Sequence, residues 1–199
     1  MINPTFREER KLYQVGYKLV AGLDEAGRGS WAGPIVAAAV ILEPRQKIRG
    51  VRDSKLLTPA KRQELFVGIT KRSITWGVGM VEHDELDRLG ISEANDQAFR
   101  RALKNLGCSP DYLLIDYFSM HGINIPTSSF VRGDQKIYSI AAASIIAKVV
   151  RDELMRQYHR VYPHYNFAQH KGYGTAEHAE ALKKHGFSPI HRASFNINF

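Results

Sequence analysis

Two adjacent carboxylates, Asp24 and Glu25, end an apolar run and are followed by the triplet Gly27-Arg28-Gly29. Successive side chains of an extended strand face opposite sides, so this pair can serve one site only if the chain bends at or just after Glu25. The glycines permit such a bend and let backbone N–H groups approach a ligand, while Arg28 suits a phosphate or sugar. Because two acids alone would repel a polyanion, the stretch predicts divalent cations and phosphodiester chemistry. An acidic pair that merely caps a turn is the alternative that this stretch leaves open.

Two more carboxylates stand where an element begins or ends. Asp116 directly follows a short apolar strand expected at 111–115, and Asp134 follows Gly133 at the start of a predicted helix. Because open α/β sheets place their sites at the carboxyl ends of strands, Asp116 matches the position of Asp24. The candidate catalytic and metal-binding residues are therefore Asp24, Glu25, Asp116 and Asp134.

Asp152 is a fifth acid, which the expected helix geometry excludes. It follows Asp134 by 18 residues, and a rise of ~1.5 Å per residue puts roughly 27 Å between them, too far for a shared metal. We expect Asp152 to pair with Lys148, four residues earlier on the same helix face. The same rise puts Lys148 about 21 Å from Asp134, so an ion pair at the edge of the core is its expected role.

The elements that must position these acids are helices and strands in imperfect alternation. Periodicity and capping residues predict helices at 5–15, from Thr58 and Pro59 onward, from Ser92 to Gly107, from Gly133 to about Tyr162, and at 176–185. Strands are expected at 18–24, 34–42, 73–81, 111–115 and 128–131, and a glycine-rich loop at 170–175. Because two strands follow one another directly near the start, we predict an α/β fold with a mixed sheet flanked by helices.

Composition limits the class of protein. The 199 residues, 44% of them hydrophobic, fit one domain with a sizeable core. The apolar stretches are too short to cross a bilayer and the N-terminus does not read as a signal peptide, so we expect a cytoplasmic protein without a membrane partner. The single cysteine, Cys108, excludes an internal disulfide. The net charge of +8 favours a polyanionic partner through counterion release.

The sequence holds no standard zinc or nucleotide-cofactor motif. The eight histidines are scattered, and we expect them at the surface or in loops. Gly77-Val-Gly79 and Gly172-Tyr-Gly174 do not complete a dinucleotide fingerprint, and no lysine-bearing phosphate loop occurs. Two rival classes remain. A glycoside hydrolase could use paired acids but gains nothing from the basic composition, and a non-catalytic nucleic-acid-binding module does not need four acids that face a polyanion.

Short motifs run in a fixed order along most of the chain. They are Asp24-Glu-Ala-Gly-Arg-Gly29, Asp53-Ser-Lys55, Leu114-Ile-Asp116, Gly133-Asp134, Ala141-Ala-Ala-Ser-Ile-Ile-Ala-Lys-Val-Val-Arg-Asp152 and His170-Lys-Gly-Tyr-Gly-Thr175. Together they resemble the motif series of bacterial ribonuclease HII, a type 2 ribonuclease H, from residue 18 to about residue 195. The resemblance implies a ribonuclease H-like fold with a five-stranded mixed sheet, in a single catalytic domain over residues 1–199. Residues from about 165 to 199 would form a C-terminal helical segment that packs on the substrate side.

The resemblance also implies an activity and a partner. The expected enzyme cleaves the RNA strand of RNA–DNA hybrids and cuts 5′ of single ribonucleotides in duplex DNA, leaving 3′-hydroxyl and 5′-phosphate ends. The residues that would hold two Mg²⁺ or Mn²⁺ ions are Asp24, Glu25, Asp116 and Asp134. Those that would contact the ribonucleotide are Gly27, Arg28, Gly29 and Tyr173, and those that would contact phosphates are Ser54, Lys55 and Lys171. A monomer is expected.

One position departs from the resemblance. The family usually has glycine after its third acid, whereas this chain has Tyr117. The course of the loop after Asp116 is therefore an open question at this point.

Overall fold

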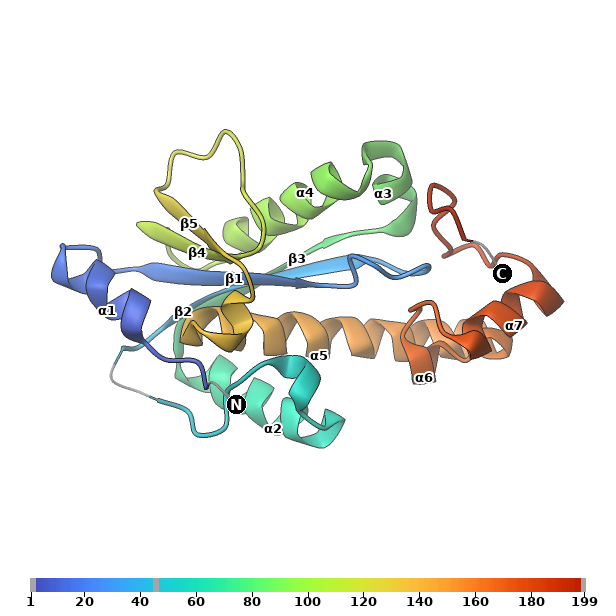
Figure 1. Ribbon diagram of the computed structural model, residues 1–199, viewed down its shortest axis with the longest axis horizontal. Helices are drawn as coiled ribbons and strands as arrows, with labels where there is room; N and C mark the ends of the chain where they lie inside the picture. The colour runs from blue at the N-terminus through green and yellow to red at the C-terminus, as the bar shows by residue number, and fades with distance from the viewer. Residues whose placement is uncertain (1–2, 45–46, 198–199) are drawn as a thin grey trace.

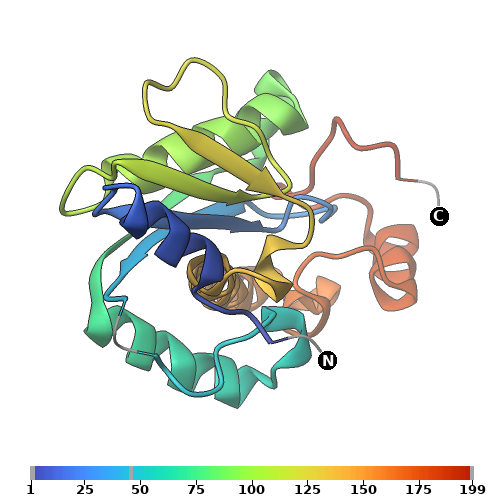
Figure 2. The same ribbon diagram turned by 60° about the vertical axis from the view of Figure 1, so that its left-hand side comes forward.

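The computed structural model describes residues 3–44 and 47–197, which form one five-stranded sheet with helices on both faces (Figures 1 and 2). The strands are β1 (Val20–Ala26), β2 (Ile35–Leu42), β3 (Ser73–Val81), β4 (Tyr112–Asp116) and β5 (Thr127–Phe130), in the spatial order β3-β2-β1-β4-β5. β1 is central, antiparallel to β2 and parallel to β4. The predicted mixed sheet of an α/β fold is thereby confirmed.

Helices cover the sheet unequally. The α-helices are α1 (Arg7–Gln14), α2 (Pro59–Arg72), α3 (His83–Leu89), α4 (Ile91–Lys104), α5 (Tyr138–Val161), α6 (Phe167–His170) and α7 (Ala176–His185), and the short 3-10 helices are η1 (Ser54–Leu56), η2 (Gly133–Gln135) and η3 (Pro163–Tyr165). α5 and α2 lie on one face and α4 on the other, while α6 and α7 lie beyond one end of the sheet (Figure 1). This end of the molecule is where β1 runs into the glycine triplet.

Alternation along β1 decides where its two acids point. Leu23 packs in the core cluster that contains Phe99 of α4, whereas Ala26 packs in the cluster that contains Ala142 of α5. Because side chains alternate along a strand, Asp24 faces α5 and Glu25 faces α4. β1 stays extended as far as Ala26, so the predicted bend comes only after both acids.

Small residues let α5 lie close against β1. A Cβ atom on Gly22 would come within 2.2 Å of the backbone of Ser139, so only glycine fits between the strand and this helix. The three alanines at 141–143 continue the smooth face and are fully buried. The close approach brings the next turn of α5, with Ser144, to the end of β1.

The helix predicted to open at Gly133 is in fact two elements. Gly133 and Asp134 belong to η2, and α5 begins only at Tyr138. Ile137 between them is extended, with φ −114° and ψ 127°, because it forms a parallel bridge with Thr5 near the N-terminus. Distances counted along one continuous helix from Asp134 are therefore wrong.

Two further boundaries differ from the predictions. The helix expected to start at Ser92 begins at Ile91, and Gly90, with φ +78°, is its N-cap residue. The same glycine ends α3, a short helix that the sequence patterns did not indicate. By contrast, Thr58 and Pro59 start α2 as expected, and α7 has the predicted bounds.

Candidate active site

The parallel pairing of β1 with β4 brings two acids side by side. Leu23 is in register with Ile115, so Asp24 and Asp116 follow at the same end of neighbouring strands. An oxygen of Asp116 accepts a hydrogen bond from the backbone N–H of Gly133, which holds η2 and its Asp134 at this end. Acids that are far apart in the sequence thus converge at one edge of the sheet.

A cavity of about 380 Å³ opens beside these strand ends. Its lining is Asp24, Glu25, Ala26, Gly27, Arg28, Gly29, Ser54, Lys55, Ser144, Lys148 and Tyr173. It therefore contains most of the residues predicted from the sequence, and both β1 acids reach it from opposite faces because the strand ends at Ala26. Asp116 is not among the lining residues. Asp134 lies next to it, since its carboxylate is 3.7 Å from Nζ of Lys55. Lys171 does not line it, and its ammonium donates to the backbone carbonyls of Ala168 and Gln169.

Burial and mutual repulsion weaken the acidity of the two β1 carboxyls. Asp24 is only 5% exposed, and burial, together with the charges of Glu25 and Asp116, raises its pKa well above its ordinary value. Burial likewise raises the pKa of Glu25 to about 7, although the charge of Arg28 opposes the shift. A positive charge placed beside either carboxyl would therefore favour its charged form.

The neighbouring ionisable groups follow the same pattern. Burial raises the pKa of Asp116 and of Asp134, and the negative charges of Asp53 and Asp116 add to the shift at Asp134. Burial alone would lower the pKa of Lys55, but the surrounding acids outweigh it and the pKa is raised. Lys55 therefore supplies part of the positive charge that this acidic edge requires.

These donors suit a hard divalent cation. Oxygen Oε2 of Glu25 is buried without a hydrogen-bond partner in the described part of the chain, which is costly unless a ligand satisfies it. Carboxylate oxygens are the ligands that Mg²⁺ and Mn²⁺ prefer. Within residues 3–44 and 47–197, no three His, Cys, Asp or Glu side chains already form a metal cage.

The two glycines of the triplet differ in what the fold demands of them. Gly27 has φ +93°, and a Cβ there would lie 1.9 Å from Nε of Arg151, so the folded chain itself requires glycine. Gly29 has no atom within 4 Å of the place where a Cβ would stand. The folded chain alone therefore leaves space at Gly29.

Tyr173 is held at the cavity by its backbone and its ring. Its carbonyl oxygen accepts a hydrogen bond from Nδ1 of His178 at 3.0 Å, and it bridges to Ser30 in antiparallel fashion. Its half-buried ring lies 5.2 Å from Nζ of Lys148 and 5.2 Å from the guanidinium carbon of Arg151. The ring is thus part of the cavity wall rather than of a closed core.

Three histidines that we expected at the surface or in loops, His170, His178 and His191, are buried. The N–H of Ser188 donates to Nδ1 of His191, so Nε2 of His191 must carry the proton and donate to Nε2 of His178 at 2.9 Å. Burial lowers the pKa of both His178 and His191 to about 4, which keeps them neutral. The pair secures the backbone of Tyr173 and has no free ring nitrogen for a metal.

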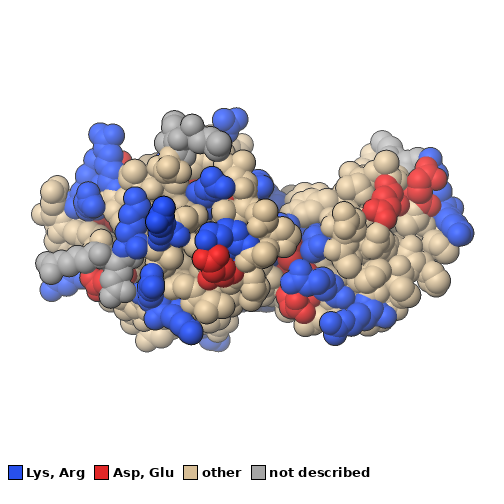
Figure 3. All heavy atoms as spheres, turned by 90° about the horizontal axis from the view of Figure 1, so that it is seen from below, with Lys and Arg blue, Asp and Glu red and all other residues tan. Residues whose placement is uncertain are grey.

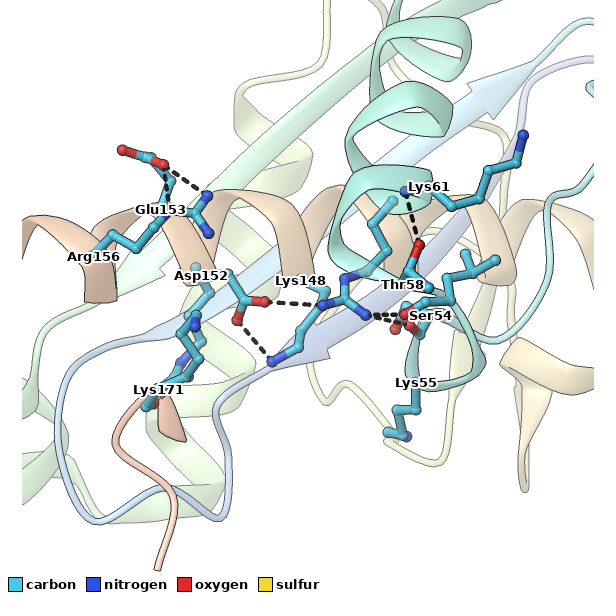
Figure 4. A network of polar contacts seen from close by, with 12 residues as sticks. Ser54, Lys55, Thr58, Lys61, Lys148, Asp152, Glu153, Arg156 and Lys171 are labelled. Atoms are coloured by element: carbon cyan, nitrogen blue, oxygen red, sulfur yellow. Dashed lines mark hydrogen bonds and ion pairs between the residues drawn. The ribbon is translucent and has the colours of Figure 1, made fainter. Parts of the chain in front are cut away.

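Two residues at the cavity were not recognised from the sequence. Lys148 does pair with Asp152, at 2.7 Å, as predicted (Figure 4). It also lines the cavity, a position that the helix count from Asp134 did not reveal because the helix begins only at Tyr138. Ser144, one turn earlier on α5, bonds to Ser54 at 2.8 Å and favours the charged form of Asp24. The i, i+4 spacing of Ser144 and Lys148 was the signal available.

The structure resolves the question of Tyr117. Tyr117 has φ +52°, a left-handed conformation that glycine adopts without strain, which explains a preference for glycine here. Its N–H still donates to the carbonyl of Phe130, and its side chain is 66% exposed. The loop therefore keeps the glycine-type backbone, and Asp116 stays at the strand end.

The mixed sheet, with acids at adjacent strand ends, defines a protein of the ribonuclease H-like fold. The ribonuclease HII of the PCNA:RNase HII complex from Archaeoglobus fulgidus has the same architecture, with a TM-score of 0.77 at 26% identity over 92% of this chain and 97% of that one. A family model described as Ribonuclease HII matches residues 21–198. The chain belongs to the ribonuclease HII family.

Curated relatives agree over nearly the whole chain. A ribonuclease HII of Acetivibrio thermocellus is 52% identical over 191 residues, which are 96% of this chain and 75% of that protein. One of Dehalococcoides mccartyi is 49% identical over 197 residues, which are 98% of this chain and 93% of that protein. The protein is accordingly an endoribonuclease of the ribonuclease H type, a metal-dependent family that acts on RNA–DNA substrates. The two rival classes are excluded.

The described residues contain no helix that is long and apolar enough to cross a membrane.

Proposed function

We propose that this enzyme cleaves the RNA strand of RNA–DNA hybrids and also cuts 5′ of a single ribonucleotide embedded in duplex DNA. The products carry 3′-hydroxyl and 5′-phosphate ends. The observation that carries the proposal is the shared cavity, where Asp24 and Glu25 stand beside the triplet at 27–29 and Tyr173. Acids for hydrolysis and groups suited to a 2′-hydroxyl thus face the same small volume.

The proposed metal ligands are Asp24, Glu25, Asp116 and Asp134. When bound, two Mg²⁺ or Mn²⁺ ions would activate the attacking water and stabilise the leaving 3′ oxygen. The raised pKa values and the unpartnered oxygen of Glu25 support this assignment. Arg28 and Lys55 would hold the polyanion while the acids are occupied.

Substrate contacts are proposed for two groups of residues. Gly27, Arg28, Gly29 and Tyr173 would meet the ribonucleotide, while Ser54 and Lys55 would meet phosphates. Lys171 remains a proposed phosphate contact, but it must first release the carbonyls of Ala168 and Gln169. Residues 1–199 would act as one catalytic domain, with about 165–199 on the substrate side. A monomer suffices because one chain supplies every proposed site residue.

Basic side chains near the site suit the flanking duplex. A hollow beside η1 is lined by Lys47, Arg49, Arg52 and Lys61, among other residues. Figure 3 shows Lys and Arg side chains outnumbering Asp and Glu on this side of the molecule. These cations would neutralise backbone phosphates and make the affinity fall as salt rises.

The decisive experiment offers the protein three duplexes in the presence of Mg²⁺ or Mn²⁺. They are a DNA duplex with one ribonucleotide, an RNA–DNA hybrid and an all-DNA duplex of the same sequence. We expect cleavage of the first two alone, with a single cut on the 5′ side of the ribonucleotide and an end that a polymerase extends. If the enzyme cleaved the hybrid but not the single-ribonucleotide duplex, the proposed cut 5′ of a single ribonucleotide would be refuted.

Alanine substitutions at the two triplet glycines should separate folding from recognition. Gly27→Ala forces a Cβ into Arg151 at a positive φ, so we expect a stability loss of about 1–3 kcal/mol. Gly29→Ala should keep its stability within about 0.5 kcal/mol yet lose about tenfold in cleavage at a single ribonucleotide, because the new methyl group crowds the sugar. Melting curves and initial rates measure both. A fully active Gly29→Ala enzyme would remove this position from the ribonucleotide contact.

Without metal, the acid pair should make folding less favourable as the pH rises. The folded pKa values of Asp24 and Glu25 lie above their unfolded values, so their stabilising contribution is present at low pH and is lost as pH passes the folded pKa, about 7 for Glu25. Mg²⁺ should therefore raise Tm by several degrees at about pH 8 and much less at about pH 5. The control is the Asp24→Asn/Glu25→Gln double variant, in which both effects should shrink. Equal Mg²⁺ effects in the two proteins would contradict the metal assignment.

A further inference from the structure

Two arginines beside the cavity, Arg151 and Arg192, are 0% exposed. Every hydrogen bond that their guanidinium groups make within residues 3–44 and 47–197 goes to a backbone carbonyl oxygen. Burial lowers the pKa of both, to about 9 for Arg192. A buried cation is costly unless its N–H groups are hydrogen-bonded. Turning any of these carbonyls away would leave a buried N–H without a partner, so the carbonyls are held firmly in place.

Arg192 fixes the direction of the peptide groups in the glycine triplet. Nη2 donates to the carbonyl of Gly27 at 2.7 Å and Nη1 donates to that of Arg28 at 2.9 Å. In a trans peptide the C=O and the following N–H point in opposite directions. The N–H groups of Arg28 and Gly29 therefore point away from Arg192.

These two N–H groups are available to a ligand. Neither of them donates a hydrogen bond within the described part of the chain, although both residues line the cavity. Adjacent free N–H donors on a cavity wall form a site for an oxygen acceptor. Within residues 3–44 and 47–197, the only other hydrogen bond to either carbonyl is the one that the N–H of Ser30 donates to Gly27 at 3.3 Å, so the two bonds from Arg192 are what keeps both carbonyls turned inward.

Arg151 joins the same loop to the segment that bears Tyr173. It donates from Nη2 to the carbonyl of Ala32 at 3.1 Å and from Nη1 to that of Lys171 at 2.9 Å. Its guanidinium carbon is 5.2 Å from the ring of Tyr173, and Gly27 lies directly against its Nε. One side chain thus sets the distance between the two halves of the proposed ribonucleotide pocket.

We propose that Arg151 and Arg192 are positioning residues for recognition of the ribonucleotide, through the backbone N–H groups of residues 28 and 29 and the ring of Tyr173. The inference rests on the proposed function and adds the interactions that keep the ribonucleotide pocket rigid. Lysine cannot replace either residue, because an ammonium is a single point of contact whereas the planar guanidinium binds several carbonyls at fixed angles. The hydrogen bonds of both residues go to protein backbone, and their ring contacts are with Tyr173 and Phe195, so they act through the pocket that they shape.

The test compares Arg192→Lys with the wild-type enzyme on two substrates. We expect kcat/KM at a single embedded ribonucleotide to fall by about 10- to 100-fold and cleavage of an all-RNA strand in a hybrid to fall much less, since neighbouring 2′-hydroxyls compensate. The amide resonances of Arg28 and Gly29 should also shift in the free protein. Arg101→Lys is the control for losing a guanidinium elsewhere, because Arg101 donates to the carbonyl of Met80 and pairs with Glu85, beside α3 and β3 and away from the cavity.

A milder variant covers the case in which Arg192→Lys fails to fold. The ring of Phe195 lies 5.1 Å from the guanidinium of Arg192, so Phe195→Leu should loosen that arginine. It should therefore lower the ratio of cleavage at a single ribonucleotide to cleavage of the all-RNA strand, but less than Arg192→Lys does. An unchanged ratio in a folded variant, with only a lower Tm, would mean that the arginines stabilise the fold without affecting ribonucleotide recognition, and would overturn the proposal. Failure of the proposed function looks different, because then the wild-type enzyme itself would not cut the single-ribonucleotide duplex.

Discussion

Asp24→Asn should abolish cleavage, with a fall in kcat of at least about a thousandfold, while hybrid binding stays the same or tightens. Asparagine has the shape of aspartate but lacks the negative charge that Asp24 would supply as the proposed metal ligand. Its loss also removes one of the charges that repel the substrate, which is why binding should not weaken. The measurements are single-turnover cleavage with Mg²⁺ and a binding titration on the same hybrid.

The matched control for this substitution is Asp111→Asn. Asp111 accepts hydrogen bonds from the backbone of Lys18 and Leu19, at the opposite end of the β1–β4 pair from Asp24. The change is chemically identical, yet we expect near-normal turnover and only a small loss of stability. Near-normal turnover in Asp24→Asn would instead sink the two-metal assignment.

The sequence was informative wherever function depends on local pattern. Alternation and end position placed Asp24 and Asp116 at strand ends, and the sheet confirms the arrangement through the register of β1 with β4. The same rules failed at Ile137, because a single bridge to Thr5 interrupts a helical pattern from 132 residues away. Local periodicity cannot carry that information.

The inner supports of the site were also hidden from sequence patterns. His178 and His191 are buried because each satisfies the other across 13 residues, a pairing that no local pattern indicates. In the sequence, Arg192 resembles an ordinary basic residue near the C-terminus. In the structure it donates a hydrogen bond to the carbonyl of Gly27, 165 residues earlier. Contacts of this kind follow from the packing of the C-terminal segment against the triplet, and only the fold reveals them.

Tyr173→Ala should change which substrate the enzyme prefers. If the ring reads the sugar, cleavage at a single embedded ribonucleotide should fall by about a hundredfold, as expected when a reacting group is misplaced by about 1 Å. Cleavage within an all-RNA strand should fall much less, because adjacent ribonucleotides offer other 2′-hydroxyl contacts. Tm should change little, since the half-buried ring stands in the cavity wall.

Tyr173→Phe divides this effect between ring and hydroxyl. It keeps the aromatic surface beside Lys148 and Arg151 and removes only the phenolic oxygen. If stacking on the sugar dominates, Tyr173→Phe should retain most of the wild-type substrate ratio; if hydrogen bonding to the 2′-oxygen or phosphate dominates, it should resemble Tyr173→Ala. A core plug would behave differently from both, because large-to-small changes in a core cost about 3–5 kcal/mol and slow every substrate equally. An unchanged substrate ratio with a lowered Tm in Tyr173→Ala would therefore show that Tyr173 stabilises the fold and does not contact the sugar.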